Sequence, residues 1–194
     1  MIIVLTGIDG SGKSTAARAL IASVRARGGR ALLVSNHAGR RVMSLAAARL
    51  GVRLPARLAD AVETLLRVGN VLVSHVRAGR FKGTVVMDRH LHCQLALRHA
   101  KDLPPGRFLP WLLAWLPEPD VIVHLDLEPA EAHRRILARG TDSESLADLE
   151  AFRAGYRALP GYAGFLRIDA SGTPEDLTAE LLTRLAAQPV TKPN

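Results

Sequence analysis

Cysteine, aromatic side chains and long apolar runs are all scarce in this sequence. The only cysteine among the 194 residues is Cys93, so no internal disulfide can form, which is typical of proteins in a reducing compartment. Aromatic residues make up 4% of the chain, which leaves few side chains for stacking on single-stranded nucleic acid. No apolar run is long enough to cross a bilayer, and the one at the amino terminus is too short for a signal peptide. We therefore expect a cytoplasmic protein without a membrane partner.

Acidic residues are outnumbered by basic ones. The chain has 26 Lys and Arg residues against 18 Asp and Glu residues, which gives a net charge of +8. Such an excess favours anionic partners but does not separate nucleotides from nucleic acid. The arginines are spread along the chain and are not gathered in a tail, so a basic, solvated surface accounts for the charge. We do not expect nucleic acid as a partner.

Short aliphatic runs alternate with amphipathic stretches along the chain. Five runs have the length and composition of strands covered on both faces: residues 2–5, 31–35, 84–87, 121–127 and 165–169. Four segments between them have the apolar spacing of helices: residues 13–28, 58–79, 129–140 and 174–187. This alternation predicts an α/β fold, a three-layer α/β/α sandwich with a five-stranded parallel sheet. No linker divides residues 1–194, so we expect a single domain, with 188–194 as a flexible tail.

The stretch TGIDGSGKST, residues 6–15, directly follows the first expected strand. It matches the pattern G-x-x-x-x-G-K-[ST], and a strand and a helix flank it as this pattern requires. Glycines allow backbone N–H groups to surround a phosphate chain, and the following helix directs its positive end at the same charge. The stretch therefore predicts a P-loop NTPase fold that binds a nucleoside triphosphate. The expected triphosphate-binding residues of the loop are Gly7, Gly10, Ser11, Gly12, Lys13, Ser14 and Thr15.

Three further charged side chains are candidates for the site. Asp9 is unexpected in an anion-binding loop; it can contact an acceptor, hold an arginine in place, or simply fit a turn. Asp88 and Arg89 end the third expected strand, at the edge where open α/β sheets bind ligands. We expect Ser14 and Asp88 to hold Mg²⁺ and Arg89 to neutralise phosphate charge; an ordinary surface ion pair between Asp88 and Arg89 is the alternative.

Four more stretches occur in an order that is known from one family. They are VVMDRH (85–90), PDVIVHLDLEPAEAHRRI (119–136), ARGTDSESLADLEAFRAGYRAL (138–159) and IDASGTPEDL (168–177). They resemble the Asp-Arg signature, the fourth strand, the lid and the adenine loop of the thymidylate kinase family, whose members also carry an acidic residue at the position of Asp9. The resemblance spans nearly the whole chain. It implies a nucleoside monophosphate kinase that transfers the γ-phosphate of ATP in the presence of Mg²⁺.

The resemblance also implies roles for residues outside the loop. It places a lid at about residues 138–146, with Arg139 nearest the transferred group, and it places Arg135 and Ser171 against ATP. Residues 7–13 contain no arginine, so the lid must supply the catalytic cation. Arginines at the end of a solvated helix are the alternative reading of this stretch. The catalytic residues implied are Asp9, Lys13, Arg89 and Arg139.

The acceptor half of the site departs from the family. The family reads thymine with a phenylalanine and an arginine on the helix before the Asp-Arg signature, and the alignment puts Arg67 and Val71 there. A register shifted by one helical turn is the alternative. Cys93, Leu97 and Arg98 stand where the family has a serine and a Tyr-Gln pair. The acceptor is therefore a nucleoside monophosphate that need not be dTMP.

Basic side chains surround the expected acceptor position. The family's arginine for the acceptor phosphate falls at Arg40 or Arg41, without the motif that would choose between them. His90 and His92 follow the Asp-Arg signature and, with Arg67 and Arg98, favour a polar or anionic acceptor. The acceptor-binding residues that we expect are Asp9, Arg40, Arg41, Arg67, Arg89 and Arg98.

Two other functions and an assembly remain open at the level of sequence. The same fold could phosphorylate a hydroxyl of a nucleoside or other metabolite, with Asp9 or Asp88 as general base. A nucleotide-dependent switch is the third possibility, although a switch would not need the arginine-bearing lid. Residues 58–76 are apolar on more than one face, and family members form homodimers through helices at this place. We expect a homodimer, and burial within the core is the alternative.

Overall fold

The structure is a computed structural model that describes residues 1–36, 56–140 and 144–188, and for residues 56–63 the backbone alone. Arg40 and Arg41 therefore lie outside the described residues. The same holds for residues 141–143 of the expected lid and for residues 189–194 of the expected tail.

The five expected strands form one sheet. They are β1 (Ile2–Thr6), β2 (Ala31–Ser35), β3 (Thr84–Asp88), β4 (Val121–Asp126) and β5 (Leu166–Asp169). All four pairings are parallel, and the order across the sheet is β2-β3-β1-β4-β5. This confirms the predicted five-stranded parallel sheet. The central strand β1 runs into the glycine-rich loop, and Leu5 of β1 is paired with Asp88 of β3, so the loop and the Asp-Arg pair meet at one edge.

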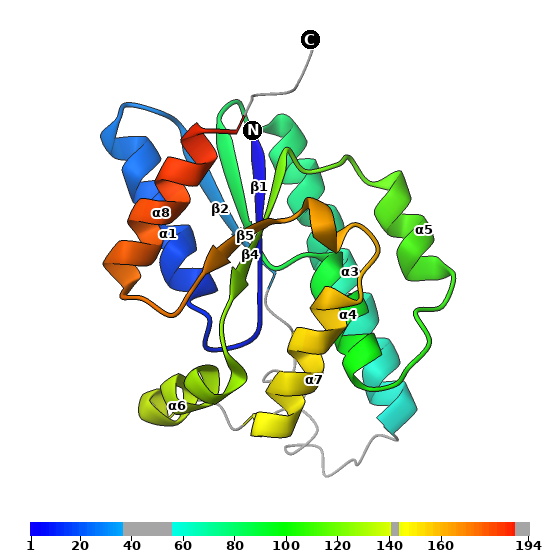
Figure 1. The fold of residues 1–194 in the computed structure, drawn as a ribbon. Coiled ribbons are helices and arrows are strands. Elements are labelled where there is room, and N and C mark those ends of the chain that lie inside the picture. Colours follow the sequence, from blue (N-terminus) through cyan, green and yellow to red (C-terminus); the bar gives the residue numbers. More distant parts are fainter. Residues whose placement is uncertain (37–55, 141–143, 189–194) are drawn as a thin grey trace.

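Helices cover both faces of the sheet, as Figure 1 shows. The helices α1 and α8 lie on one face, and α3, α4, α5 and α7 lie on the other. Their bounds are α1 Lys13–Ala26, α3 Ala56–Arg80, α4 Leu91–Ala100, α5 Phe108–Trp115, α6 Pro129–Arg139, α7 Leu146–Arg157 and α8 Pro174–Ala186, with a 3₁₀ turn at Tyr162–Gly164. The strands are buried on both sides, since Val4, Leu5, Val86 and Val123 have essentially no exposed surface. The aliphatic composition of the strands follows from this double coverage.

Local chemistry defines where the helices start. Pro129 and Pro174 occupy first-turn positions of α6 and α8, where the missing N–H costs nothing. The hydroxyl of Thr173 accepts a hydrogen bond from the backbone N–H of Asp176, and the Asp176 carboxylate accepts one in return from the Thr173 N–H, which completes a capping box. These helix starts were predicted from the sequence and are confirmed.

Three of the described helices, α4, α5 and α7, are not among those that the spacing predicts. Gly155 lets α7 approach α4 so closely that a Cβ at this position would lie 2.2 Å from the Ala96 carbonyl oxygen. Tertiary packing of this kind stabilises a short helix whose own pattern is weak. The sequence of α5, FLPWLLAW, is apolar without a period, so its pattern alone does not distinguish a helix from a buried strand. No helix in the described part of the chain is both long and apolar enough to span a membrane.

Candidate active site

The loop between β1 and α1 has a backbone that only glycine adopts readily. Gly7, Gly10 and Gly12 have φ values of 137°, 84° and 86°. A Cβ on Gly7 would lie 2.6 Å from the Leu125 carbonyl oxygen, and one on Gly10 would lie 2.7 Å from that of Ala132. The loop is thus pressed against β4 and α6, with no room for a side chain at Gly7 or Gly10. At these positions only backbone groups can face a ligand.

Lys13 lies at the start of α1 and is buried under this loop. Its Nζ donates to the carbonyl of Ile8 at 2.6 Å and lies 3.4 Å from Oδ1 of Asp9. Burial lowers the pKa of Lys13, and the carboxylate of Asp9 opposes this shift. The ammonium group therefore stays within the loop, where the predicted phosphate-binding backbone lies.

Asp9 connects the two cations of the site. Its Oδ1 accepts a hydrogen bond from Nη2 of Arg89 and also faces Lys13. Burial alone would raise the pKa of Asp9, but the charges of Lys13 and Arg89 hold it well below its usual range. The two neighbouring cations therefore stabilise Asp9 as a carboxylate, and of the roles left open for it, the structure shows it holding an arginine.

Arg89 itself has a backbone conformation that is rare for a residue with a side chain. Its φ is 75°, in the left-handed region. Its carbonyl accepts a hydrogen bond from Nδ2 of Asn36 at 2.7 Å, and Oδ1 of Asn36 accepts one from the Ser74 hydroxyl at 2.6 Å. The conformation is thus held at the guanidinium by Asp9 and at the carbonyl by Asn36.

Ser14 and Asp88, the expected magnesium ligands, lie next to each other. The Ser14 hydroxyl donates to Oδ2 of Asp88 at 2.6 Å. Oδ1 of Asp88 is buried and has no hydrogen-bond partner among the residues that the structure describes. A buried carboxylate oxygen without a partner calls for a cation or water, and oxygen ligands suit Mg²⁺. The residues present therefore fit a magnesium ion.

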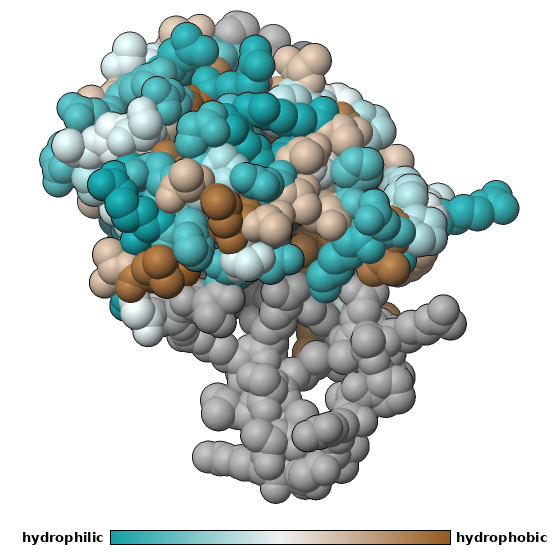
Figure 2. Space-filling view, turned by 60° about the horizontal axis from the view of Figure 1, so that its bottom comes forward, coloured by the Kyte–Doolittle hydropathy of each residue, from teal (hydrophilic) through white to brown (hydrophobic). Residues whose placement is uncertain are grey.

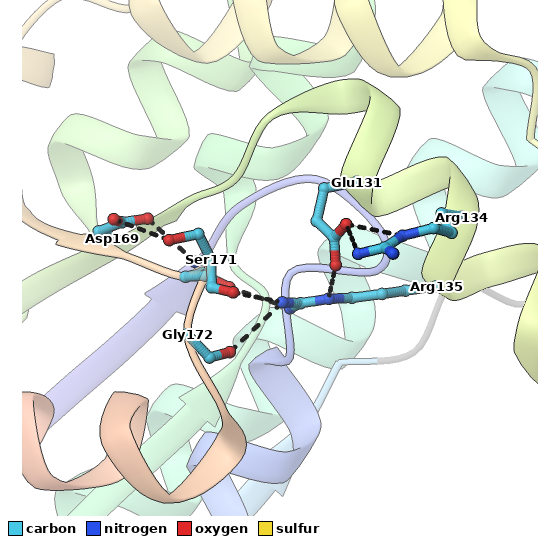
Figure 3. A network of polar contacts seen from close by, with 7 residues as sticks. Glu131, Arg134, Arg135, Asp169, Ser171 and Gly172 are labelled. Carbon is cyan, nitrogen blue, oxygen red and sulfur yellow. Dashed lines mark hydrogen bonds and ion pairs between the residues drawn. The ribbon is translucent and has the colours of Figure 1, made fainter.

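A cleft of about 590 Å³ runs from the loop to the β5–α8 turn. Its lining includes the predicted ATP-binding residues Gly10, Gly12, Thr15, Arg135 and Ser171, together with Arg139, which was predicted as a catalytic residue of the lid. Arg135 joins the two walls of the cleft (Figure 3). From α6 its guanidinium donates to the carbonyls of Ala170 and Ser171, at 2.9 and 3.0 Å, while Nε donates to Glu131 at 2.7 Å. Arg135 thereby fixes the position of the expected adenine loop.

Arg139 is exposed at the end of α6 and also lines this cleft. The residues that follow it, 141–143, are outside the described part of the chain, and α7 begins after the cap at Ser145. Figure 2 brings this edge of the sheet forward, and the described surface there is mainly hydrophilic with scattered apolar residues. Such a surface suits a charged ligand.

The expected base-reading positions lie between α3 and α4. Arg67 is buried, with 3% of its surface exposed, on the same stripe of α3 as Thr64 and Val71. Thr64 accepts a hydrogen bond from Nε2 of Gln94 at 3.0 Å, whereas Oε1 of Gln94 is buried without a partner among the described residues. Val71 is fully buried in an apolar cluster with Leu95. The stripe of α3 that faces α4 therefore carries an arginine at position 67, and α4 carries an amide at position 94.

Three other side chains that were expected near the acceptor point elsewhere. Arg98 lies in the last turn of α4, and its Nε donates to the carbonyl of Pro104 at 3.0 Å. At 1.5 Å per residue, this places it about 12 Å along the helix from His90. His90 and His92 are buried and hydrogen-bond to each other through their Nδ1 atoms, 3.1 Å apart. The structure therefore does not gather these side chains around Asp9 and Arg89.

Comparison with known proteins agrees with this geometry. Residues 5–181 match the family model described as thymidylate kinase. The chain belongs to the thymidylate kinase family. It is 29% identical to the thymidylate kinase of Leptospira borgpetersenii over 94% of this chain and 91% of that protein. It is 32% identical to the thymidylate kinase of Xanthomonas campestris over 91% and 79%, and 33% identical to the probable thymidylate kinase of Pyrococcus abyssi over 73% and 72%.

Membership of the thymidylate kinase family establishes the class of reaction. The chain is an ATP-dependent phosphotransferase that acts on a nucleoside monophosphate, and the family uses ATP and Mg²⁺. The predicted family, P-loop fold, enzyme class and cofactors are thereby confirmed. That the acceptor need not be dTMP stays a prediction.

Three residues near the site were not predicted. Asn36 supports Arg89, Gln94 faces α3, and the hydroxyl of Tyr156 donates to the carbonyl of Gly7 at 3.3 Å. Asn36 carried a signal, because a polar residue directly after an expected strand lies at the same edge as Asp88. Tyr156 carried none, since 149 residues separate it from the glycine that it contacts.

Proposed function

We propose that Lys13, Arg89 and Arg139 carry the charge of the transferred phosphoryl group and that Asp9 positions Arg89 for this task. The observation that supports this proposal is the pair of contacts that Asp9 makes with Arg89 and Lys13, which places one cation on each side of the carboxylate. Phosphoryl transfer needs such positioning and charge neutralisation more than it needs covalent chemistry.

The donor side of the site would hold ATP between the loop and the β5–α8 turn. Backbone N–H groups of the loop would receive the phosphates, and Thr15, Arg135 and Ser171 would line the space for the nucleoside. Ser14 and Asp88 would hold Mg²⁺, which supplies charge neutralisation at the donor phosphates when bound. Arg139 would approach the transferred group from the lid side of the cleft.

The charge state of the site favours a phosphate acceptor over a hydroxyl acceptor. A hydroxyl needs a base to accept its proton, whereas a phosphate monoester is already ionised near neutral pH. Asp9 has a pKa far below its usual range, so it is a weak base, and Oδ2 of Asp88 already accepts a hydrogen bond from the Ser14 hydroxyl. We therefore place the transfer on the phosphate of a nucleotide.

For the acceptor base we propose that Arg67 and Gln94 provide the hydrogen bonds. Val71 is enclosed in apolar side chains and offers none, which supports the register shifted by one helical turn, with Arg67 as the arginine of the pocket. Arg67 is a donor only, and Oε1 of Gln94 is an acceptor without a partner among the described residues, so a base with both a carbonyl and an N–H fits. The relatives are named thymidylate kinase, which makes dTMP the first acceptor to test and dUMP the second.

The predicted homodimer finds support on α3. Leu65, Leu66, Val73 and Val76 are exposed and follow the helical repeat of one stripe. Gly69 lies on the same stripe with open space beside it, so a second helix could approach closely. We propose that two copies pack through this stripe. Sedimentation should give the mass of a dimer, and Val73→Glu should reduce it to that of a monomer.

The function is tested by ADP release from MgATP with a panel of acceptors. The panel holds dTMP, dUMP, dCMP, UMP, CMP, AMP and GMP with the corresponding nucleosides, and Lys13→Ala serves as the blank. We expect turnover with a pyrimidine monophosphate and none with nucleosides. Turnover with nucleosides alone would move the reaction to a hydroxyl, and ADP release without any acceptor would favour a switch.

A further inference from the structure

A second cavity, of about 680 Å³, lies among α4, α5, α7 and the start of β4. Its lining includes Leu95 of α4, Leu113 of α5, Ile122 of β4 and Phe165 after α7. It shares no lining residue with the cleft beside the phosphate loop. We refer to it as the side cavity. Its volume is that of a typical small-molecule site.

The walls of the side cavity are mainly leucine, proline and other apolar residues. The polar groups among them are His90 and His92 at the start of α4, His99 near its end, and Glu118 before β4. A mostly apolar wall with a few polar groups is the usual composition of a site for a small organic molecule.

His92 is the end of a chain of three buried imidazoles. Nε2 of His75, on α3, lies 2.8 Å from Nε2 of His90, and Nδ1 of His90 lies 3.1 Å from Nδ1 of His92. His90 therefore uses both ring nitrogens within the chain. The ring of His92 contacts the edge of Phe165, another wall residue, with centroids 5.3 Å apart. Of the two imidazoles of this chain that line the side cavity, His90 and His92, only His92 has a nitrogen, Nε2, that the chain does not use.

The direction of the hydrogen bonds in this chain follows from its other end. Nδ1 of His75 is buried and has no partner among the described residues. A buried N–H without a partner is costlier than a buried lone pair, so the proton of His75 belongs on Nε2. His75 then donates to His90, His90 donates through Nδ1 to His92, and His92 carries its proton on Nε2. Burial lowers the pKa of all three imidazoles, that of His92 to about 4, so each ring has one proton to place.

We propose that the side cavity is a second ligand site, for an uncharged, mainly apolar organic molecule whose carbonyl oxygen accepts a hydrogen bond from Nε2 of His92. The apolar wall contacts the body of the molecule. Because the direction of the hydrogen bonds between the imidazoles is fixed, Nε2 of His92 carries a proton and acts only as a donor. Glu118 in the wall disfavours a carboxylate. A metal does not fit, because His90 has no free nitrogen and the described residues hold no group of three His, Cys, Asp or Glu that could bind one.

The test compares two probes of the same shape, 1-phenyl-2-pyrrolidinone and phenylcyclopentane, of which only the first has a carbonyl. Binding to the full chain is followed by the ¹⁵N and ¹³C signals of the histidine rings. We expect the pyrrolidinone to bind at least tenfold more tightly than the hydrocarbon and to shift the ¹⁵N signal of Nε2 of His92. Before the probe is added, the signals should show the proton of His92 on Nε2. A tenfold ratio corresponds to about 1.4 kcal/mol, the size of one hydrogen bond.

Two variants make the result specific. Leu113→Trp fills the side cavity and should abolish binding of both probes, while His92→Phe should leave the hydrocarbon bound and remove the advantage of the carbonyl. Folding of each variant is checked by its thermal transition, and Leu113→Met serves as a second, milder substitution if the tryptophan is not tolerated. Equal affinity for the two probes, binding unaffected by substitution of Leu113, or a proton found on Nδ1 of His92 would each overturn the proposal.

Discussion

The donor and acceptor sides of this site are built in different ways. The donor side is a continuous loop in which backbone groups face the ligand, and the glycines there are required by φ values and by close approach. The acceptor side that we propose is assembled from side chains on α3 and α4, which meet only when the two helices pack. A backbone site depends on a short, local pattern, whereas a side-chain site changes with each substitution and each shift of register. The first resists change, and the second is where specificity can vary.

The largest effect should come from breaking the donor loop at Gly10. Gly10→Ala places a Cβ 2.7 Å from the Ala132 carbonyl oxygen and keeps a φ of 84°. The loop must shift by a few tenths of an ångström or more, and misplaced groups of this kind cost about a hundredfold in rate. We expect kcat/KM for ATP to fall by about that factor in an ADP-release assay.

A matched control for this change exists at Gly28. Its φ is 77°, close to that of Gly10, but nothing lies within 4 Å of the position of its Cβ. Gly28→Ala should cost about 1 kcal/mol in the free energy of unfolding from backbone strain and leave ATP kinetics unchanged. If both variants lost activity equally, strain and not the close approach to α6 would govern the loop.

The next effect should follow from removing the carboxylate that joins the two sides. Asp9→Asn leaves Lys13 and Arg89 facing each other without compensation. We expect kcat to fall about 30-fold and the free energy of unfolding to fall by about 2 kcal/mol. The second value is smaller than that for a fully buried ion pair, because the side chains of Asp9 and Arg89 are about one-fifth exposed and solvent screens their charges. MgATP should restore part of this stability, since its phosphates replace the lost negative charge.

Urea unfolding with and without MgATP measures both parts of that expectation. Glu150→Gln removes an exposed carboxylate on α7 and serves as the control, for which little change is expected. A stability loss that MgATP leaves untouched would mean that Asp9 acts on the fold and not on the phosphate site.

These expectations also mark how far the sequence could be interpreted. The loop, Asp88 and Arg89 are specified by short stretches next to strands, so their position at the edge of the sheet could be predicted. Arg98 was expected near the acceptor, yet α4 carries it to the far end of the helix. Its distance from His90 follows from the helical rise, but the face of α4 on which it lies depends on how α4 packs on α7, and the close approach of Gly155 to Ala96 fixes this through a contact that is distant in sequence. Spacing within one helix contains no such information.

Acid should weaken both sides of the molecule, and the side of α3 and α4 more, because burial also lowers the pKa of His75 and of His90 there. Burial lowers the pKa of His92, on α4, and of His124, beside the loop, to about 4, against an ordinary value of 6.5. The unfolded chain therefore binds more protons than the folded protein between pH 6.5 and 4, so stability is complete above pH 6.5 and falls as the pH drops through this window. Each histidine should contribute a loss of about 2 kcal/mol between pH 7.5 and 5.

Urea unfolding at several pH values provides the measurement. His92→Phe should remove about 2 kcal/mol of the loss between pH 7.5 and 5, while the contribution of His124 remains. The exposed His99, on the last turn of α4, offers a control in His99→Gln, which should leave the pH dependence nearly unchanged. A pH dependence that persists in full in His92→Phe would place the titrating groups elsewhere.

The smallest expected effect concerns the acceptor side alone. Gln94→Leu removes a side chain whose Oε1 is buried without a partner among the described residues, so folding should not suffer and can gain slightly. If Gln94 reads the acceptor base, kcat/KM for the monophosphate should nevertheless fall about tenfold, the value of one hydrogen bond to a base. The KM for ATP should stay as it is, because no residue of the ATP cleft is touched.

Leu95→Met is the matched control, since Leu95 is the next residue of α4 and belongs to the apolar cluster. Unchanged acceptor kinetics in Leu95→Met together with a tenfold loss in Gln94→Leu would separate base reading from helix packing. A loss of ATP affinity in Gln94→Leu would instead mean that the two sides are coupled through Asp88 and Arg89, which precede α4 directly. The contrast between a backbone-built donor side and a side-chain-built acceptor side would then hold for geometry but not for energetics.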